Sequence, residues 1–270
     1  MSGIKDFFVS RYKDGWIIEA DYKQLEIVAL AILSGDAALK NDLNNKIDLH
    51  TRNAADLFNT KEALITKEER RIAKSLSFQL QYGAGANSMA KKLNLDVMLC
   101  KKFIAQYYTR YPGVKMFQEA MKDKVLLNRL PGTDRYGVSK VQSPTGRIYT
   151  YHEEDSAYNT HPTFRPTQYK NYPIQGFAAD IVLMMLGELL FVLKKELLST
   201  VKMCNTVHDS ILFDCSNDLL LVACSRIKEV LDNTAWYVRN RWGIVVDVPL
   251  EVDIKIGKTW GTMEPYRYEI

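Results

Sequence analysis

The run Trp16-Ile17-Ile18-Glu19-Ala20-Asp21-Tyr22 is apolar and rich in β-branched residues, and it ends on an aspartate. A second apolar run, from Cys204 to Phe213, carries Val207-His208-Asp209 in its middle. Neighbouring strands lie about 5 Å apart, so pairing of the two runs would set Asp21 beside Asp209. Two carboxylates at that separation repel each other unless cations lie between them. The sequence therefore predicts a site for two magnesium ions, of the kind that carries out phosphoryl or nucleotidyl transfer.

The composition is that of an ordinary globular protein, with 47% hydrophobic and 25% charged residues among 270. A net charge of +4 is weak evidence for a polyanionic partner. The four cysteines lack zinc-type spacing and are expected to be buried free thiols in a reducing compartment. No signal peptide is evident, and the apolar stretch 181–193 is expected to be too short and too polar to span a bilayer. These features favour a soluble cytoplasmic protein without a membrane partner.

The order of elements favours an α+β fold, in which an antiparallel sheet receives a helical insertion. After the first strand, apolar spacing predicts a helix up to about Ser34, and a largely helical region follows over 48–130. The stretch 141–173, rich in tyrosine and proline, is expected to form loops and a short hairpin around Thr145-Gly146. Further elements are expected after it: helices over about 175–199 and 217–233, and a last strand over 245–256.

The helix expected over 66–83 carries a distinctive face. It starts with a capping-box pattern, Thr66-Lys67-Glu68-Glu69, and ends at Gly83. Arg70, Lys74 and Phe78 are four residues apart and share one side, with Tyr82 one turn further on. Two cations followed by aromatic rings suit a triphosphate and its base. Taken alone, the same pattern also fits a solvated amphipathic helix.

Several blocks resemble the motifs of family A DNA polymerases, the family of bacterial DNA polymerase I, and they occur along the chain in the family's order. Asp21-Tyr22-Lys23-Gln24-Leu25-Glu26 resembles motif A, and Val207-His208-Asp209 resembles motif C. Arg70-Arg71-x-Ala73-Lys74-x-x-x-Phe78-x-x-x-Tyr82-Gly83 resembles motif B, the fingers O-helix. Asn171-Tyr172-Pro173-Ile174-Gln175-Gly176 resembles the segment that meets the primer–template, and Asp48-Leu49-His50-Thr51 also fits. The matches extend over nearly the whole chain.

The resemblance implies a role for each matched residue. Asp21, Asp209 and the backbone carbonyl of Tyr22 would hold two magnesium ions, with manganese as an alternative, and Lys74 would join the two aspartates as a catalytic residue that protonates the leaving group. Glu26 would act as a steric gate that excludes a ribose 2′-hydroxyl. The positions implied to bind the nucleotide are Gln24, Glu26, His50, Arg70, Lys74, Phe78 and Tyr82. The positions implied to bind DNA are Asn171, Gln175 and His208.

The resemblance also implies a right-hand polymerase that lacks its thumb. Residues 1–36 would be the first palm segment, with motif A. Residues 37–166 would be the fingers, with the O-helix at 66–83, and residues 167–270 the second palm segment, with motif C. Some positions depart from the family pattern, among them Ser77 and Gln79 in motif B and Ser210 after motif C. We expect such departures to tune the enzyme rather than to abolish its activity.

The expected function is DNA-dependent DNA synthesis on a primer–template from dNTPs. Because the family's thumb, exonuclease domain and preceding palm segment find no counterpart, we expect the C-terminal part of a split polymerase. A second polypeptide would supply the remainder, and split genes suggest a phage enzyme acting in the host cytoplasm. A truncated or compact enzyme would explain the same sequence. Two other functions stay open: a single-subunit RNA polymerase, and a non-catalytic DNA-binding or assembly subunit derived from a polymerase.

Overall fold

A computed structural model describes residues 3–131, 136–155, 160–196 and 200–267. The chain divides into two compact units. Unit 1 comprises residues 1–27 and 177–270, and unit 2 comprises residues 28–176. Two helices, α1 (Leu25–Ser34) and α8 (Pro166–Glu196), contribute residues to both units. Helices and antiparallel strands occur together in the chain, which confirms the expected α+β class.

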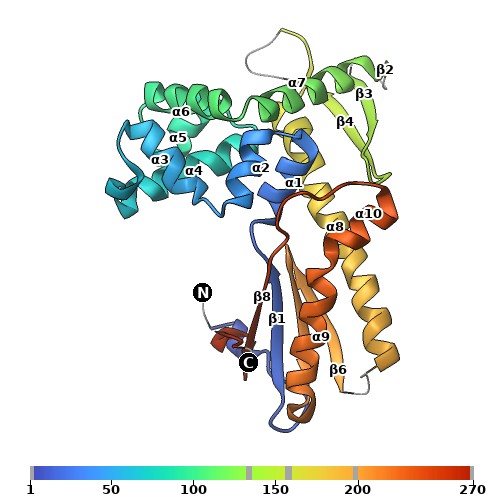
Figure 1. The fold of residues 1–270 in the computed structure, drawn as a ribbon. Coiled ribbons are helices and arrows are strands. Elements are labelled where there is room, and N and C mark those ends of the chain that lie inside the picture. The colour runs from blue at the N-terminus through green and yellow to red at the C-terminus, as the bar shows by residue number, and fades with distance from the viewer. Residues whose placement is uncertain (1–2, 132–135, 156–159, 197–199, 268–270) are drawn as a thin grey trace. The chain divides into compact units, whose positions relative to one another are not determined.

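Unit 1 is built on a five-stranded antiparallel sheet in the order β6-β7-β1-β8-β9 (Figure 1). The strands are β1 (Trp16–Tyr22), β6 (Val201–Val207), β7 (Ser210–Cys215), β8 (Val252–Gly257) and β9 (Glu264–Pro265). The central strand β1 pairs with β7 on one side and β8 on the other, so that Asp21 lies opposite Ser210 and Asp253. The predicted pairing of the two aspartate-bearing runs is therefore confirmed.

Helix α9 (Leu220–Asp232) packs against β1 and β8 in this unit (Figure 1). Its buried residues recur every three or four positions and so form one apolar face: Ala223, Cys224, Ile227, Val230 and Leu231. Helix α10 (Thr234–Trp242) follows after a single residue. Short 3-10 turns complete the unit: η1 (Lys5–Phe7), η3 (Asn217–Leu219) and η4 (Trp260–Thr262).

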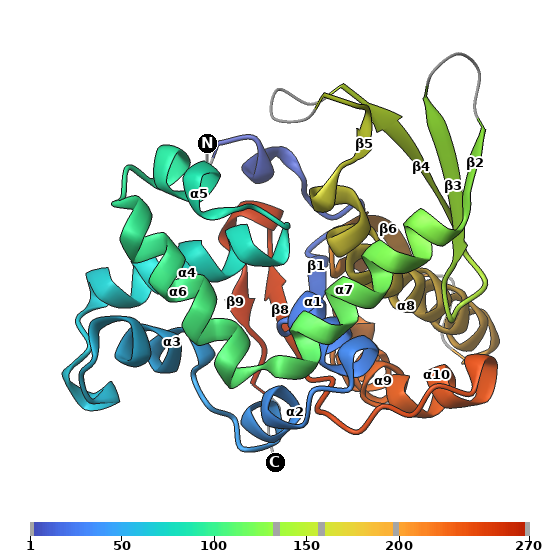
Figure 2. The ribbon, with the colours of Figure 1, turned by 90° about the horizontal axis from the view of Figure 1, so that it is seen from above.

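Unit 2 is mainly helical. After α1 come α2 (Ala37–Asn44), α3 (Leu49–Phe58), η2 (Glu62–Leu64), α4 (Lys67–Gln81), α5 (Ala86–Leu93), α6 (Val97–Arg110) and α7 (Pro112–Leu127). A four-stranded antiparallel sheet follows, made of β2 (Arg129–Pro131), β3 (Gly137–Gln142), β4 (Ile148–Glu154) and β5 (Thr163–Phe164) (Figure 2). The helical region predicted over 48–130 is thus confirmed in the form of several separate helices.

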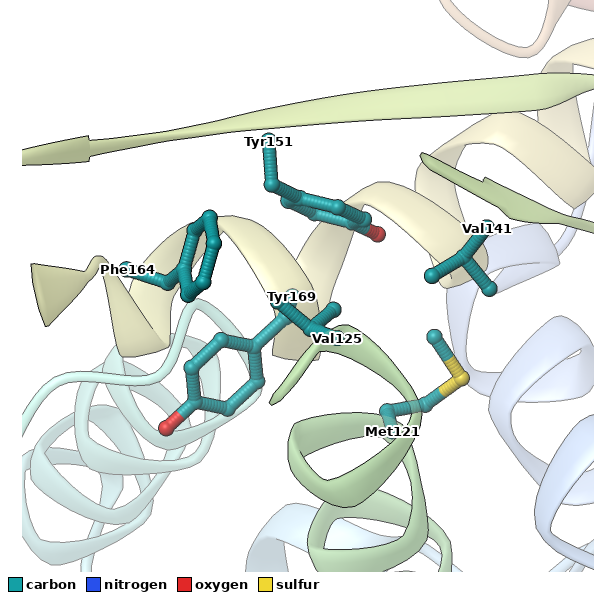
Figure 3. Close-up of a cluster of buried hydrophobic side chains, with 6 residues drawn as sticks. All are labelled: Met121, Val125, Val141, Tyr151, Phe164 and Tyr169. Atoms are coloured by element: carbon teal, nitrogen blue, oxygen red, sulfur yellow. The ribbon is translucent and has the colours of Figure 1, made fainter. Parts of the chain in front are cut away.

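A cluster of buried side chains joins this small sheet to its neighbouring helices (Figure 3). Its members come from α7, β3, β4, β5 and the first turn of α8: Met121, Val125, Val141, Tyr151, Phe164 and Tyr169. Strand β3 buries alternate residues, as expected of a strand with one face on a core. The cluster explains why this tyrosine-rich segment folds instead of remaining a set of loops.

Three expectations about the elements were wrong. The stretch 141–173 is not mainly loop, since it holds most of β3 together with β4, β5 and the start of α8. Helix α8 begins at Pro166 rather than near 175 and continues through Pro173. The last strand is confined to Val252–Gly257, and α10 was not expected at all. The expected end of α8 near Ser199 lies outside the described residues.

Two properties of single segments also differ from expectation. Cys204 is exposed because it lies on the edge strand β6, although all four cysteines are free and the other three are buried. Helix α8 is 31 residues long. By length and composition alone it would suffice to cross a membrane, with 44% of its most apolar window buried inside the protein. The expectation that this apolar stretch is too short was therefore wrong.

Candidate functional site

The two aspartates predicted to share a metal site lie side by side in unit 1. Asp21 is the penultimate residue of β1, and Asp209 lies in the two-residue turn between β6 and β7. The backbone N–H of Tyr22 donates a hydrogen bond of 3.2 Å to the carbonyl oxygen of Asp209. This bond fixes the turn against the end of β1, next to the Asp21 carboxylate.

The β6–β7 turn is tightly held. His208 adopts the left-handed conformation, with φ of 55°, which is uncommon for a residue other than glycine. The Thr206 hydroxyl donates to the carbonyl of Ser210 at 3.0 Å, and the Ser210 hydroxyl donates to the carbonyl of Val207 at 3.0 Å. Such strain persists only where surrounding contacts impose it, and it recurs at functional sites. The turn thereby places Asp209 and leaves the His208 side chain exposed.

The surroundings of Asp21 favour a positive charge nearby. Its pKa is raised, first because it is half-buried and second because the Asp209 carboxylate is near, while Lys255 opposes the rise. Carboxylate and carbonyl oxygens are the ligands that magnesium prefers. Within the described part of the chain, no group of three or more His, Cys, Asp or Glu side chains is arranged to hold a metal ion. The carboxylates of Asp21 and Asp209 are oxygen donors of the kind that magnesium prefers.

The Tyr22 side chain is not available to a ligand. Its ring is buried, and its hydroxyl lies 2.6 Å from the hydroxyl of Thr234, which in turn donates to the carbonyl of Leu231 at 2.5 Å. This chain of bonds anchors the end of β1 to the helices behind the sheet. The other motif A residues lie just beyond the strand: Gln24 is exposed with φ of 51°, and Glu26 lies in the first turn of α1.

The predicted triphosphate-binding residues gather on α3 and α4 of unit 2. The capping box is present, since Thr66 accepts from the Glu69 N–H at 3.2 Å while the Glu69 carboxylate accepts from the Thr66 N–H at 2.8 Å. Lys74 and His50 both lie near the Phe78 ring: the Lys74 Nζ is 5.7 Å from its centroid, and the His50 centroid is 5.9 Å away. The structure thus brings together His50, Lys74 and Phe78.

Arg70 lies in the same group, but it has a partner that the sequence reading did not assign. Its guanidinium donates to both carboxylate oxygens of Asp48, at 2.7 and 3.2 Å. Burial alone would raise the pKa of Asp48, but the bonds from Arg70 and Thr51 lower it to about 2. Burial also lowers the pKa of His50, and the neighbouring cations add to this effect. The Asp48 carboxylate opposes this lowering of the His50 pKa, and the buried Nδ1 has no hydrogen-bond partner among the described residues.

Tyr82 and Asn171 line a separate cavity within unit 2. The cavity has a volume of about 440 Å³, and its wall includes the polar side chains of Gln79, Lys92 and Arg165. At Gly83, the residue after Tyr82, φ is +76° and a Cβ would lie 2.9 Å from the Cα of Thr167. Gln175, also on α8, is exposed. Asn171 and Tyr82 are therefore brought together at this cavity.

Comparison with known proteins identifies the chain. The sequence profile of DNA polymerase family A matches residues 1–262. The chain belongs to DNA polymerase family A. Among relatives of this family A chain, DNA polymerase I of Geobacillus stearothermophilus is 30% identical over 262 residues, and the DNA polymerase of Bacillus phage SP01 is 28% identical over 264. These alignments cover 95% and 96% of this chain but only 27% of each relative.

A solved structure agrees with this assignment. The polymerase domain of Pol1 from M. smegmatis, in complex with DNA primer-template and dNTP, superposes on the family A chain with a TM-score of 0.76 and 28% sequence identity. The superposition covers 96% of this chain and 42% of that domain. The chain therefore corresponds to less than half of a family A polymerase domain.

Proposed function

We propose that this chain carries the nucleotidyl-transfer site of a DNA-dependent DNA polymerase, which extends a primer along a template from dNTPs with two divalent metal ions. The observation that carries the proposal is the placement of Asp209 against the end of β1, beside Asp21. Membership of DNA polymerase family A supports it. So does the similarity to a polymerase domain described in complex with primer–template and dNTP.

In the proposed mechanism, Asp21, Asp209 and the Tyr22 carbonyl hold the ions. When bound, magnesium supplies activation of the primer 3′-hydroxyl and stabilises the charge of the departing pyrophosphate. The chain's own contribution is to fix one carboxylate at the end of β1 and the other in the adjoining β6–β7 turn before the substrates arrive. Pre-organisation of this kind lowers the cost of assembling the site during the reaction.

Unit 2 would bind the incoming dNTP. Lys74 is exposed on α4, and Arg70 presents a fork of N–H donors suited to phosphate oxygens. Arg70 would have to share its guanidinium between Asp48 and the triphosphate, or exchange one for the other. We assign Lys74 the transfer of a proton to the leaving group, and place Phe78, His50 and Tyr82 around the nucleotide.

The remaining assignments concern substrate choice and DNA. We propose that Glu26 and Gln24 contact the sugar end of the nucleotide, where Glu26 excludes a 2′-hydroxyl. Asn171, Gln175 and His208 would contact the DNA. Minor-groove acceptors are nearly the same for every base pair, so such contacts test the shape of a pair without reading its sequence. On this assignment unit 1 is the palm and unit 2 the fingers.

We further propose that a second polypeptide completes the polymerase domain. Less than half of the matched Pol1 domain has a counterpart in this chain. Three apolar side chains on the unit 1 part of α8, Leu183, Leu190 and Phe191, are 56%, 47% and 66% exposed. They are seven and eight residues apart and so lie along one helix face. A surface of this kind is expected where another chain docks.

Primer extension with the full chain tests the catalytic proposal. Asp209→Ala and Asp21→Ala should each abolish dNTP incorporation, measured with and without a polypeptide that carries the preceding part of a family A polymerase domain. Asp218→Ala, which removes an exposed carboxylate from η3, is the matched control and should leave incorporation unchanged. Undiminished synthesis by Asp209→Ala would favour a scaffold subunit. Processive extension by the chain alone would refute the need for a partner.

A further inference from the structure

A lysine that no motif identified lies at the candidate metal site. Lys255 is on β8, where it pairs directly across from Glu19 on β1, while Asp253 pairs with Asp21. Its ammonium donates to Glu19 Oε2 at 3.3 Å and lies 3.6 Å from Asp21 Oδ2. The lysine therefore bridges two carboxylates on the same face of the sheet, and one of the two is a proposed metal ligand.

Glu19 is fixed in place by a second contact. The indole N–H of Trp260 donates to Glu19 Oε1 at 3.0 Å, so each oxygen of this carboxylate has a partner. The Glu19 side chain is only 12% exposed, whereas Asp21 and Lys255 are each 35% exposed. Glu19 is therefore the more buried of the two carboxylates that contact Lys255, and its position is fixed by Trp260. Asp21 is the more exposed of the two.

A divalent cation and the Lys255 ammonium compete for the same carboxylate. The Lys255 ammonium lowers the pKa of Asp21, whereas the Asp209 carboxylate raises it, so the ammonium offsets part of the repulsion at Asp21. A metal ion bound there would in turn be repelled by a positive charge a few ångströms away. Because Glu19 is a second ion-pair partner for Lys255, the ammonium can leave Asp21 without losing all of its ion pairs.

We propose that Lys255 is a resident counter-ion of the metal site, which occupies Asp21 when no metal is bound and retreats to Glu19 when a metal ion enters. Lys255 is then a positioning residue that sets the metal concentration at which the site fills. This inference rests on the proposed function, since it takes Asp21 as a metal ligand. It adds a residue pair, Glu19 and Lys255, whose effect on metal binding has a defined sign.

Direct measurement of Mn²⁺ binding to the full chain tests the inference, with free Mn²⁺ followed by electron paramagnetic resonance in the absence of DNA and nucleotide. Lys255→Met should tighten Asp21-dependent binding about tenfold, because it removes a competing charge. Glu19→Gln keeps an acceptor for Trp260 but removes the second ion-pair partner of Lys255, so it should weaken Mn²⁺ binding about threefold or more. Lys258→Met is the matched control. Its ammonium donates to the backbone carbonyl of Asp14 at 2.7 Å, at the opposite end of β1 from Asp21, and binding should be unchanged.

The double variant separates this mechanism from a simple sum of charges. If Glu19 acts through Lys255, Glu19→Gln should have no further effect in the Lys255→Met background. If Glu19→Gln weakens Mn²⁺ binding equally in the parent chain and in Lys255→Met, the exchange of Lys255 between Asp21 and Glu19 is refuted. Unchanged binding in Lys255→Met would overturn the counter-ion role, provided that circular dichroism shows a native fold, and Lys255→Gln serves if it does not. Binding in the parent chain that Asp21→Asn leaves intact would instead refute the metal site and the proposed function.

Discussion

Replacing Thr234 with valine should loosen the end of β1, although residue 234 touches no substrate group. The Tyr22 hydroxyl must be the donor in its 2.6 Å bond to Thr234, because the Thr234 proton goes to the carbonyl of Leu231. Thr234 is 0% exposed and Tyr22 is 2% exposed, so no water replaces a lost bond. Valine keeps the volume but leaves the buried Tyr22 hydroxyl without its acceptor, whereas the Leu231 carbonyl still accepts from the backbone N–H of Asn233.

An unsatisfied buried group costs about 1–3 kcal/mol, so Thr234→Val should lower the free energy of unfolding by about 1–3 kcal/mol. Tyr22→Phe removes a donor and leaves the Thr234–Leu231 bond intact, so it should cost only about 1 kcal/mol. The double variant should be less destabilised than the sum of the two, because the orphaned Tyr22 hydroxyl is then absent.

Urea unfolding monitored by circular dichroism measures all three variants, with Thr234→Ser as the control that keeps the hydroxyl. A loss below about 0.5 kcal/mol in Thr234→Val, or strict additivity in the double variant, would refute this account of the anchor. A secondary readout is metal binding at Asp21, the residue before Tyr22, which should weaken in Thr234→Val.

Three further perturbations follow from unit 2. Asp48 has a pKa lowered to about 2 in the fold, so its contribution to stability is complete above its ordinary pKa and is lost as the pH falls through about 2; Asp48→Asn should therefore flatten the melting temperature measured between pH 5 and 2. Thr66→Ala removes the capping box of α4 and should cost about 1 kcal/mol in urea unfolding, whereas Thr66→Ser should not. Gly83→Ala forces a Cβ onto the Thr167 backbone at a left-handed position and should cost about 1–3 kcal/mol, with Gly85→Ala, in open space, as the calorimetric control.

Local pattern was enough to predict the elements that carry Asp21 and Asp209. Strand β1 and the β6–β7 hairpin are marked by β-branched residues that end at a polar turn, and these runs do pair. The amphipathic face of α4 and its Thr66 cap were equally legible, because both depend on residues three or four apart. Features that depend only on residues a few positions apart can therefore be predicted from the sequence.

Contacts between distant residues were beyond that reach. The Arg70–Asp48 pair joins residues 22 positions apart, and Lys255 meets Glu19 across 236 positions. Helix α8 was expected to begin only near 175, yet it starts at Pro166 and continues through Pro173, since proline costs a helix one hydrogen bond without always ending it. The hairpin around Thr145-Gly146 was expected, but the full length of its strands was not, because their apolar residues find a core only when α7 packs against them.

The connection between β6 and β7 has no slack. Only His208 and Asp209 separate the two strands, and the side-chain alternation of a strand has a period of two. One added or deleted residue would turn the following strand over and exchange the side chains of its two faces, both of which are buried. Tags, affinity handles and grafted loops should therefore be placed elsewhere in this molecule, because the length of this turn sets the position of Asp209 and the pairing of the two strands.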